Sequence, residues 1–176
     1  MLQKRGVSPV IATVLLVVIT LVAIGILAAF VIPFVNKSLS NEDCFNILGN
    51  LKFEDSSYSC YVNDNPGRTG FSIRVDNKDI VGFKTVFYSG GSSEPVEIIN
   101  STDGTALSPE VRMLGNSTNL VLPKTGGVRT YVVHGIYEKI ELYPILSSGT
   151  TCDQSDILED ITRCLDSGIV GQLRGS

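Results

Sequence analysis

Four cysteines and one histidine stand out in this 176-residue chain, because such side chains can form disulfides or hold a zinc ion. Cys44, Cys60, Cys152 and Cys164 all follow a long apolar segment, and His134 is the only imidazole. No two cysteines have the C-x-x-C spacing that is typical of zinc sites. An even number of cysteines beyond a membrane segment favours disulfides in an oxidising compartment. The sequence therefore predicts two disulfides and no metal centre.

The connectivity of the disulfides has three possibilities, because four cysteines can pair in three ways. We expect Cys44 to pair with Cys60, and Cys152 with Cys164, since each of these pairs closes a short loop. A loop of about 15 residues contributes roughly 3 kcal/mol through the lost entropy of the unfolded chain. Both cross-links would then hold a helical or irregular segment against the rest of the domain.

A catalytic constellation is not recognisable in the sequence. His134 has no H-x-x-x-H or cysteine partner nearby, and the chain has no G-x-S-x-G motif, phosphate loop or dinucleotide fingerprint. The acidic residues near the C-terminus lack the pattern of a calcium loop and are interpreted as a solvated helix face: Asp153, Asp156, Glu159 and Asp160. The net charge of -4 does not suit a phosphate backbone. We therefore expect no enzyme activity, no cofactor and no nucleic-acid partner.

The element that precedes these residues is an apolar segment near the N-terminus. No charged side chain occurs between Arg5 and Lys37. As a helix, residues 7–35 would extend roughly 43 Å, which exceeds both the roughly 30 Å hydrocarbon core of a bilayer and the apolar region of a secretory signal. Lys4 and Arg5 precede the segment, so the positive-inside rule predicts a cytoplasmic N-terminus and an external C-terminal part.

The first residues of this segment resemble the amino terminus of archaeal type IV pilins. A basic pair and a glycine are followed by a Ser-Pro motif and an uninterrupted apolar stretch, with the sequence KRGVSPVI at residues 4–11. The resemblance implies that a prepilin peptidase recognises Lys4, Arg5 and Gly6 and cuts before Val7. Ile11 stands where bacterial pilins usually carry a glutamate, and the glycine-rich start of archaellins is absent.

The resemblance also implies a function. The chain would be a structural subunit of an archaeal type IV pilus-like surface filament, assembled through its N-terminal helix for adhesion or surface contact. Its implied partners are copies of itself or other pilins, the prepilin peptidase, the pilus assembly machinery and, before assembly, the cell membrane. Two alternatives remain open: a single-pass membrane-anchored extracellular binding domain, and an archaellin of a motility filament.

Beyond about Leu51 the apolar residues change from a helical to an alternating spacing. Residues 71–75 and 81–88 alternate and are joined by a short polar turn at 76–79, which predicts a hairpin. Further short strands are predicted at residues 57–62, 95–99, 119–122, 128–134 and 136–143. Seven or eight strands at this spacing indicate an antiparallel β-sandwich after the long helix, and therefore an α+β fold.

The expected organisation has three parts. Residues 1–6 form the leader, residues 7–48 the transmembrane and filament-core helix, and residues 49–176 an extracellular β-sandwich with a disulfide-held C-terminal tail. Within that tail, Ile157, Ile161 and Leu165 recur at helical spacing, so we expect a short helix between Cys152 and Cys164.

Three Asn-x-Ser/Thr sequons are present, at Asn36, Asn100 and Asn116. On an extracellular domain such sequons are candidate glycosylation sites. Asn100 and Asn116 fall in predicted loops, whereas Asn36 lies at the membrane edge of the helix, where packing would hide it. We therefore favour Asn100 and Asn116 as acceptors.

Overall fold

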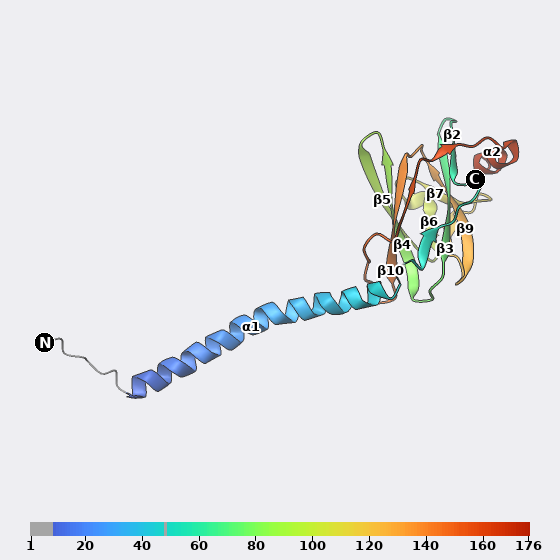
Figure 1. The fold of residues 1–176 in the computed structure, drawn as a ribbon. Helices are drawn as coiled ribbons and strands as arrows, with labels where there is room; N and C mark the ends of the chain where they lie inside the picture. Colours follow the sequence, from blue (N-terminus) through green and yellow to red (C-terminus); the bar gives the residue numbers. More distant parts are fainter. Residues whose placement is uncertain (1–8, 48) are drawn as a thin grey trace. The chain divides into compact units, whose positions relative to one another are not determined.

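The computed structural model describes residues 9–47 and 49–176 (Figure 1). Lys4, Arg5, Gly6 and Val7 of the predicted cleavage motif lie outside the described residues. The chain divides into two compact units, Met1–Glu42 and Asp43–Ser176, and each is described by itself.

The first unit consists of the helix α1, which runs from Pro9 to Phe45 and also reaches the start of the second unit. Helix-compatible Ala, Leu, Ile and Val residues fill its first two thirds without a charge. Pro9 occupies the first turn, where the missing N–H removes no intrahelical hydrogen bond. The segment Ile11–Ile32 is long and apolar enough to cross a membrane, as the sequence predicts.

The second unit is built mainly from two open sheets. The larger sheet has six strands: β1 (Leu51–Phe53), β2 (Cys60–Val62), β3 (Arg68–Val75), β7 (Val111–Met113), β9 (Gly127–His134) and β12 (Thr162–Arg163). The smaller sheet has four: β4 (Ile80–Ser89), β5 (Ser92–Ile99), β10 (Lys139–Leu146) and β11 (Asp156–Glu159). The remaining elements are a small ribbon of β6 (Thr102–Asp103) and β8 (Asn119–Leu120), a 3-10 turn at Gly104–Ala106 and the helix α2 (Ser167–Arg174). All the described pairings are antiparallel except that of β12 with β2.

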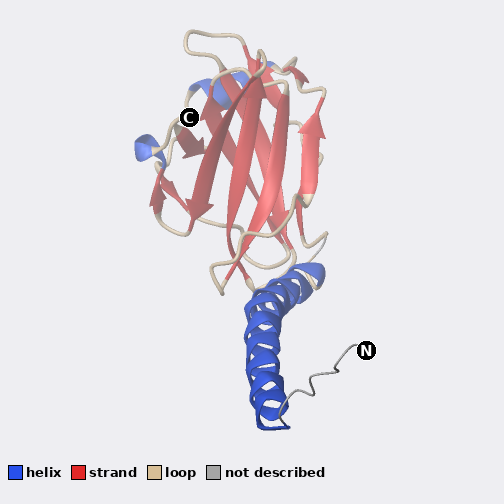
Figure 2. Cartoon of the chain, turned by 90° about the vertical axis from the view of Figure 1, so that its left-hand side faces the viewer, coloured by secondary structure: helices blue, strands red, loops and turns tan. Residues whose placement is uncertain are grey.

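The core lies between these sheets and explains the alternating pattern. Figure 2 views the strands of the domain face-on. Phe71 of β3 packs edge-on against Phe87 of β4, with ring centroids 5.6 Å apart. Tyr131 of β9 stacks on Phe71 at 5.6 Å and meets Phe83 at 5.4 Å. The Tyr131 hydroxyl donates to the Val121 carbonyl at 2.9 Å, so the buried phenol keeps a hydrogen bond. The prediction of a long apolar helix followed by an antiparallel β-sandwich is therefore confirmed.

The predicted hairpin between residues 71–75 and 81–88 is wrong. β3 pairs with β9 along its whole length, whereas β4 pairs with β10 and β5. Both strands turn aromatic side chains toward one core from opposite sides, so the turn at 76–79 crosses from one sheet to the other. The hairpin that forms instead joins β4 to β5 through Gly90 and Gly91, whose φ angles are 55° and 82°.

The predicted helix between Cys152 and Cys164 is also wrong, because this segment contains β11 and β12. β11 adds to the edge of β10, and the Asp156 carboxylate accepts a hydrogen bond from the Phe53 N–H at 2.8 Å. Asp156 and Glu159 therefore lie on a strand and not on a solvated helix face. The helix forms later, at α2, where Asp166 caps the N-terminus by accepting from the Gly168 and Ile169 N–H groups.

The two predicted disulfides are confirmed, but the expected pairing is wrong. Cys44 is bonded to Cys152 and Cys60 to Cys164, at sequence separations of 108 and 104 residues. The parallel pairing of β12 with β2 brings Cys164 next to Cys60, and the Cys164 N–H donates to the Tyr61 carbonyl at 2.9 Å. The Cys152 N–H similarly donates to the Pro144 carbonyl of β10. Sheet neighbours that are distant in sequence therefore decide the pairing.

Candidate functional site

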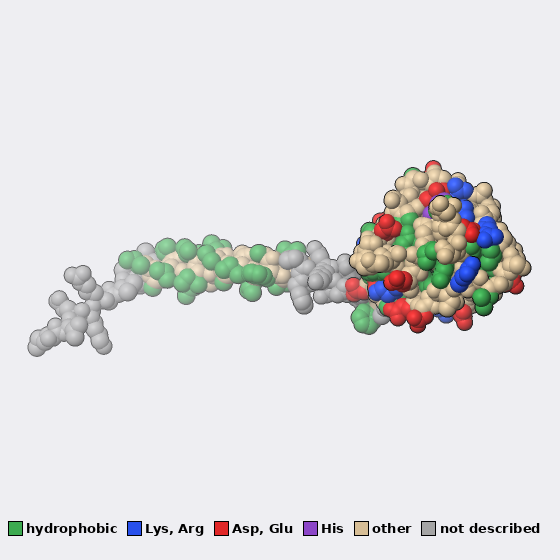
Figure 3. All heavy atoms as spheres, turned by 90° about the horizontal axis from the view of Figure 1, so that it is seen from above, with side chains coloured by type: hydrophobic (Ala, Val, Ile, Leu, Met, Phe, Trp, Pro, Cys, Tyr) green, Lys and Arg blue, Asp and Glu red, His purple; other side chains and the backbone are tan. Residues whose placement is uncertain are grey.

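The most unusual surface of the described chain is that of α1. Between Ile11 and Ile32 every large apolar side chain is 51–72% exposed. Figure 3 shows this stretch covered by hydrophobic side chains, with no Lys, Arg, Asp or Glu among them. The apolar residues surround the helix and do not form one stripe. Monomeric soluble proteins rarely expose an apolar patch of this extent, so the surface requires lipid or other apolar helices around it.

The polar groups of this helix fit such surroundings. Its backbone groups are hydrogen-bonded within the helix, as hydrocarbon surroundings require. The Thr20 hydroxyl donates to the Val17 carbonyl at 2.8 Å, one turn back along the chain. A hydroxyl that is bonded to its own helix can enter an apolar environment at little cost. The helix can therefore lie in lipid or against other helices without a change of conformation.

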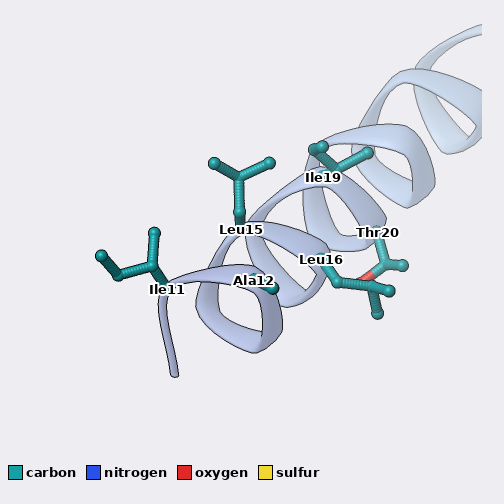
Figure 4. Close-up of a pocket in the computed structure, with 6 residues that line it drawn as sticks. All are labelled: Ile11, Ala12, Leu15, Leu16, Ile19 and Thr20. Atoms are coloured by element: carbon teal, nitrogen blue, oxygen red, sulfur yellow. The ribbon is translucent and has the colours of Figure 1, made fainter. Parts of the chain in front are cut away.

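The surface of α1 is uneven, with projecting and short side chains side by side. A shallow depression is lined by side chains of this helix alone: Ile11, Ala12, Leu15, Leu16, Ile19 and Thr20. In Figure 4 these side chains point outward from the ribbon, and the short Ala12 side chain lies between longer ones. Further along, the space beside Gly25 that a Cβ would occupy is open. Ridges and hollows of this kind allow side chains of a neighbouring helix to interdigitate.

The C-terminal end of α1 is fixed to the β domain. Cys44 lies in the last turn of the helix, and its bond to Cys152 ties that turn to the loop after β10. Ile47 is buried in the domain core, and Leu51 begins β1 opposite Val75. The final turn of the helix and the domain are therefore joined both by the chain and by a second covalent link.

His134, the lone histidine, lies on β9 with its Nδ1 atom 3.3 Å from Glu110 Oε2. Burial is the largest influence on its pKa and lowers it from the usual value. The described residues include no group of three or more His, Cys, Asp or Glu placed to hold a metal ion. The structure therefore places the His134 side chain in contact with Glu110.

One polar cluster is only partly visible in the sequence. On the outer face of the sheet that contains β10, Glu141 accepts hydrogen bonds from Lys139 at 2.9 Å and from the hydroxyls of Tyr88 and Tyr143 at 2.8 Å each. These bonds lower the pKa of the Glu141 carboxyl, and the bond from Lys139 has the largest effect. The alternation along β10 places Lys139, Glu141 and Tyr143 on one face, but Tyr88 comes from β4 and only the pairing of the strands reveals it. The cluster is a satisfied ionic network on the domain surface.

The sequons in loops are both at exposed turns. Asn100 follows β5, and its Oδ1 atom accepts a hydrogen bond from the Leu122 N–H at 3.0 Å. Asn116 lies between β7 and β8 with a φ of 67°, and its Oδ1 atom accepts from the Arg112 guanidinium. The Asn36 side chain lies outside the described residues.

Comparison with known families supplies an independent observation. Residues 5–39 match the family model described as archaeal type IV pilin, N-terminal. No curated protein and no solved structure matches the chain. The matched segment contains the whole apolar stretch whose surface needs apolar surroundings, and the matched family is structural, not enzymatic. Residues 5–39 are therefore similar to the N-terminal domain of archaeal type IV pilins, which supports a type IV pilin-like filament subunit.

Proposed function

We propose that this chain is a structural subunit of an archaeal type IV pilus-like surface filament that serves adhesion or surface contact. The observation that carries the proposal is the uniformly exposed apolar surface of Ile11–Ile32 within the segment that matches the pilin family. A subunit of this kind acts by assembly and contact, without chemistry of its own.

The first proposed step is maturation. A prepilin peptidase at the cytoplasmic face would recognise Lys4, Arg5 and Gly6 and cut before Val7, leaving the apolar helix on the protein. The precursor, with residues 1–6 as its leader, would lie in the cell membrane with its N-terminus in the cytoplasm. The mature chain would begin with the helical part at 7–48, followed by the external domain at 49–176.

The second proposed step is transfer from the membrane into a filament. α1 has 37 residues and is therefore about 55 Å long, against roughly 30 Å for the hydrocarbon core. Lipid tails and neighbouring apolar helices satisfy the same Val, Leu and Ile side chains, so the pilus assembly machinery can move the helix between them without exposing it to water. The β domain would form the outer surface of the filament, where two disulfides stabilise it and Asn100 and Asn116 are proposed glycan acceptors.

The proposal is tested by placing a charge within the helix. Ile19→Asp introduces a carboxylate in the middle of the apolar stretch, at a cost of about 2.5 to 3.5 kcal/mol for membrane insertion. We expect insertion to persist because the remaining apolar residues favour it, and filament formation to fail because every subunit would repeat an unpaired charge in the core. Ser93→Asp, on the exposed surface of β5, is the matched control and should assemble normally.

Both variants would be expressed in cells that lack the wild-type subunit, and filaments would be counted by electron microscopy. Normal filaments from Ile19→Asp would contradict the proposal. So would a wild-type protein that stays in the membrane as single subunits, since that behaviour fits the single-pass anchored binding domain.

A further inference from the structure

A groove of about 700 Å³ opens at the end of the β domain where the chain enters from α1. Its position follows from the register, because Leu51 of β1 pairs with Val75 at the end of β3, and the Asp76 N–H donates to the Asn50 carbonyl at 2.7 Å. One wall is the turn between β3 and β4, and the other is the segment at 121–125 that leads into β9.

The groove has an apolar floor and a basic rim. Val75, Ile80 and Leu122 form much of the floor, together with Val81, which is 41% exposed. The rim is polar and consists of Asn77, Lys78, Asn100, Lys124 and Thr125. Lys78 and Lys124 are exposed and form no ion pair with any residue that the structure describes.

Hydrogen bonds within the chain hold both walls in place. The Asn100 side-chain Oδ1 atom accepts from the Leu122 N–H at 3.0 Å, and the Gly126 N–H donates to the Val75 carbonyl at 2.7 Å. In the opposite wall, the Asn77 side chain accepts from the Asp79 N–H at 2.9 Å. The groove is therefore formed before a partner arrives, which lowers the entropic cost of filling it.

A surface of complementary character lies at the C-terminal turn of α1. Phe45 is 75% exposed, although a large aromatic ring is stabilised by burial. The chain around it is acidic, because Glu42 and the exposed Asp43 precede it and no basic residue occurs between Lys37 and Lys52. An acidic turn that presents an aromatic ring is complementary to an apolar groove with a basic rim in both hydrophobic character and charge.

We propose that the groove of one subunit receives Phe45 of a neighbouring copy of this chain. The ring lies on the apolar floor, and the acidic turn around it lies within the field of Lys78 and Lys124. Because the groove and the turn are different surfaces, the contact is head-to-tail, and in the proposed filament its repetition builds an open helical array. The inference rests on the filament function proposed above and deepens it by naming a specific contact between subunits outside the apolar part of α1.

The contact also distinguishes the two loop sequons. Asn100 is part of the rim, so a glycan on it would obstruct the mouth of the groove, whereas Asn116 is not among the residues that line it. The contact therefore narrows the two acceptors proposed above to Asn116, and we expect Asn100 to be unmodified in assembled filaments.

Two full-length variants test the contact. Phe45→Ala removes the ring, and Lys78→Glu combined with Lys124→Glu reverses the charge of the rim. Each should reduce the number of filaments more than about tenfold, as expected for a central aromatic anchor and for like charges at an interface. Leu165→Ala is the matched control, because Leu165 is an apolar side chain that is 96% exposed elsewhere on the domain. Intact disulfides in the purified variants verify that each has folded.

Zero-length carbodiimide coupling of wild-type filaments gives a second readout. Mass spectrometry of the resulting dimers should find the peptide with Glu42 and Asp43 joined to Lys78 or Lys124. Normal filament numbers in both variants, absence of this cross-link, or full glycosylation of Asn100 in filaments would overturn the contact and leave the helix-assembled filament in place. A wild-type protein that forms no filaments would instead overturn the proposed function itself.

Discussion

Removal of the Cys60–Cys164 disulfide is the perturbation whose energetic effect follows most directly from the fold. The bond closes a loop with a sequence separation of 104 residues. Cross-linking a loop of about 100 residues removes unfolded-state entropy that corresponds to about 4.7 kcal/mol. Single domains are usually stable by only about 5 to 15 kcal/mol, so Cys60→Ala with Cys164→Ala should remove a large part of the stability. Cys44→Ala with Cys152→Ala should act similarly, because its separation of 108 residues is nearly the same.

The assay is guanidinium unfolding of the detergent-solubilised full chain under non-oxidising, non-reducing conditions. The chain has six tyrosines and no tryptophan, so tyrosine fluorescence follows the domain. Peptide mapping of the wild-type protein without reduction would establish the pairing in parallel. A loss of less than about 1 kcal/mol in both double variants would refute the loop-entropy reasoning. Mapping that links Cys44 to Cys60 would refute the pairing itself.

Three further outcomes are expected. Asp166→Ala should lower the stability of α2 by about 1 kcal/mol, because it removes the cap at the Gly168 and Ile169 N–H groups. Thermal unfolding measures this loss, with Asp153→Ala as the control. The pKa of Glu141 is lowered in the folded state, so its contribution to stability is present above the ordinary glutamate pKa of about 4.3 and is lost as the pH falls through the folded-state pKa. Glu141→Gln should therefore reduce the fall in melting temperature at acidic pH. A melting temperature that falls at acidic pH as steeply as in the wild type would contradict this. Asn116→Gln should remove any glycan mass from the 111–120 region of the β domain, whereas an unaltered glycan mass would place the acceptor elsewhere.

The parts of the fold that depend on local pattern were predictable from the sequence. A charge-free apolar stretch of this length predicts a helix in apolar surroundings, and alternating apolar residues in β3, β4 and β9 identify strands. The pairing of those strands is a property of the whole domain. β3 and β4 have the same alternation whether they form a hairpin or face each other across a core, so the turn at 76–79 does not distinguish the two arrangements.

The structure of the C-terminal tail and the disulfide pairing also depend on contacts between segments that are distant in sequence. Ile157, Ile161 and Leu165 have helical spacing, but the pairing of β11 with β10 and the hydrogen bond from Phe53 to Asp156 favour an extended chain. Loop length in sequence favours short-range cysteine pairs, whereas the position of β12 beside β2 brings Cys60 and Cys164 together. The groove could not be recognised from sequence at all, because its walls come from segments that only the folded sandwich brings together.

The central claim is that α1 leaves the membrane as the assembly element of a filament, and the most direct measurement is the N-terminal sequence of this chain in purified surface filaments. Filaments would be sheared from cells, examined by electron microscopy and analysed by mass spectrometry. We predict filaments that contain this chain with Val7 as its first residue. A chain that remains in the membrane fraction with Met1 intact would contradict the claim in favour of a permanent anchor. A mature chain that begins near Phe30 would contradict it as well, because ordinary signal cleavage would have removed the helix on which assembly depends.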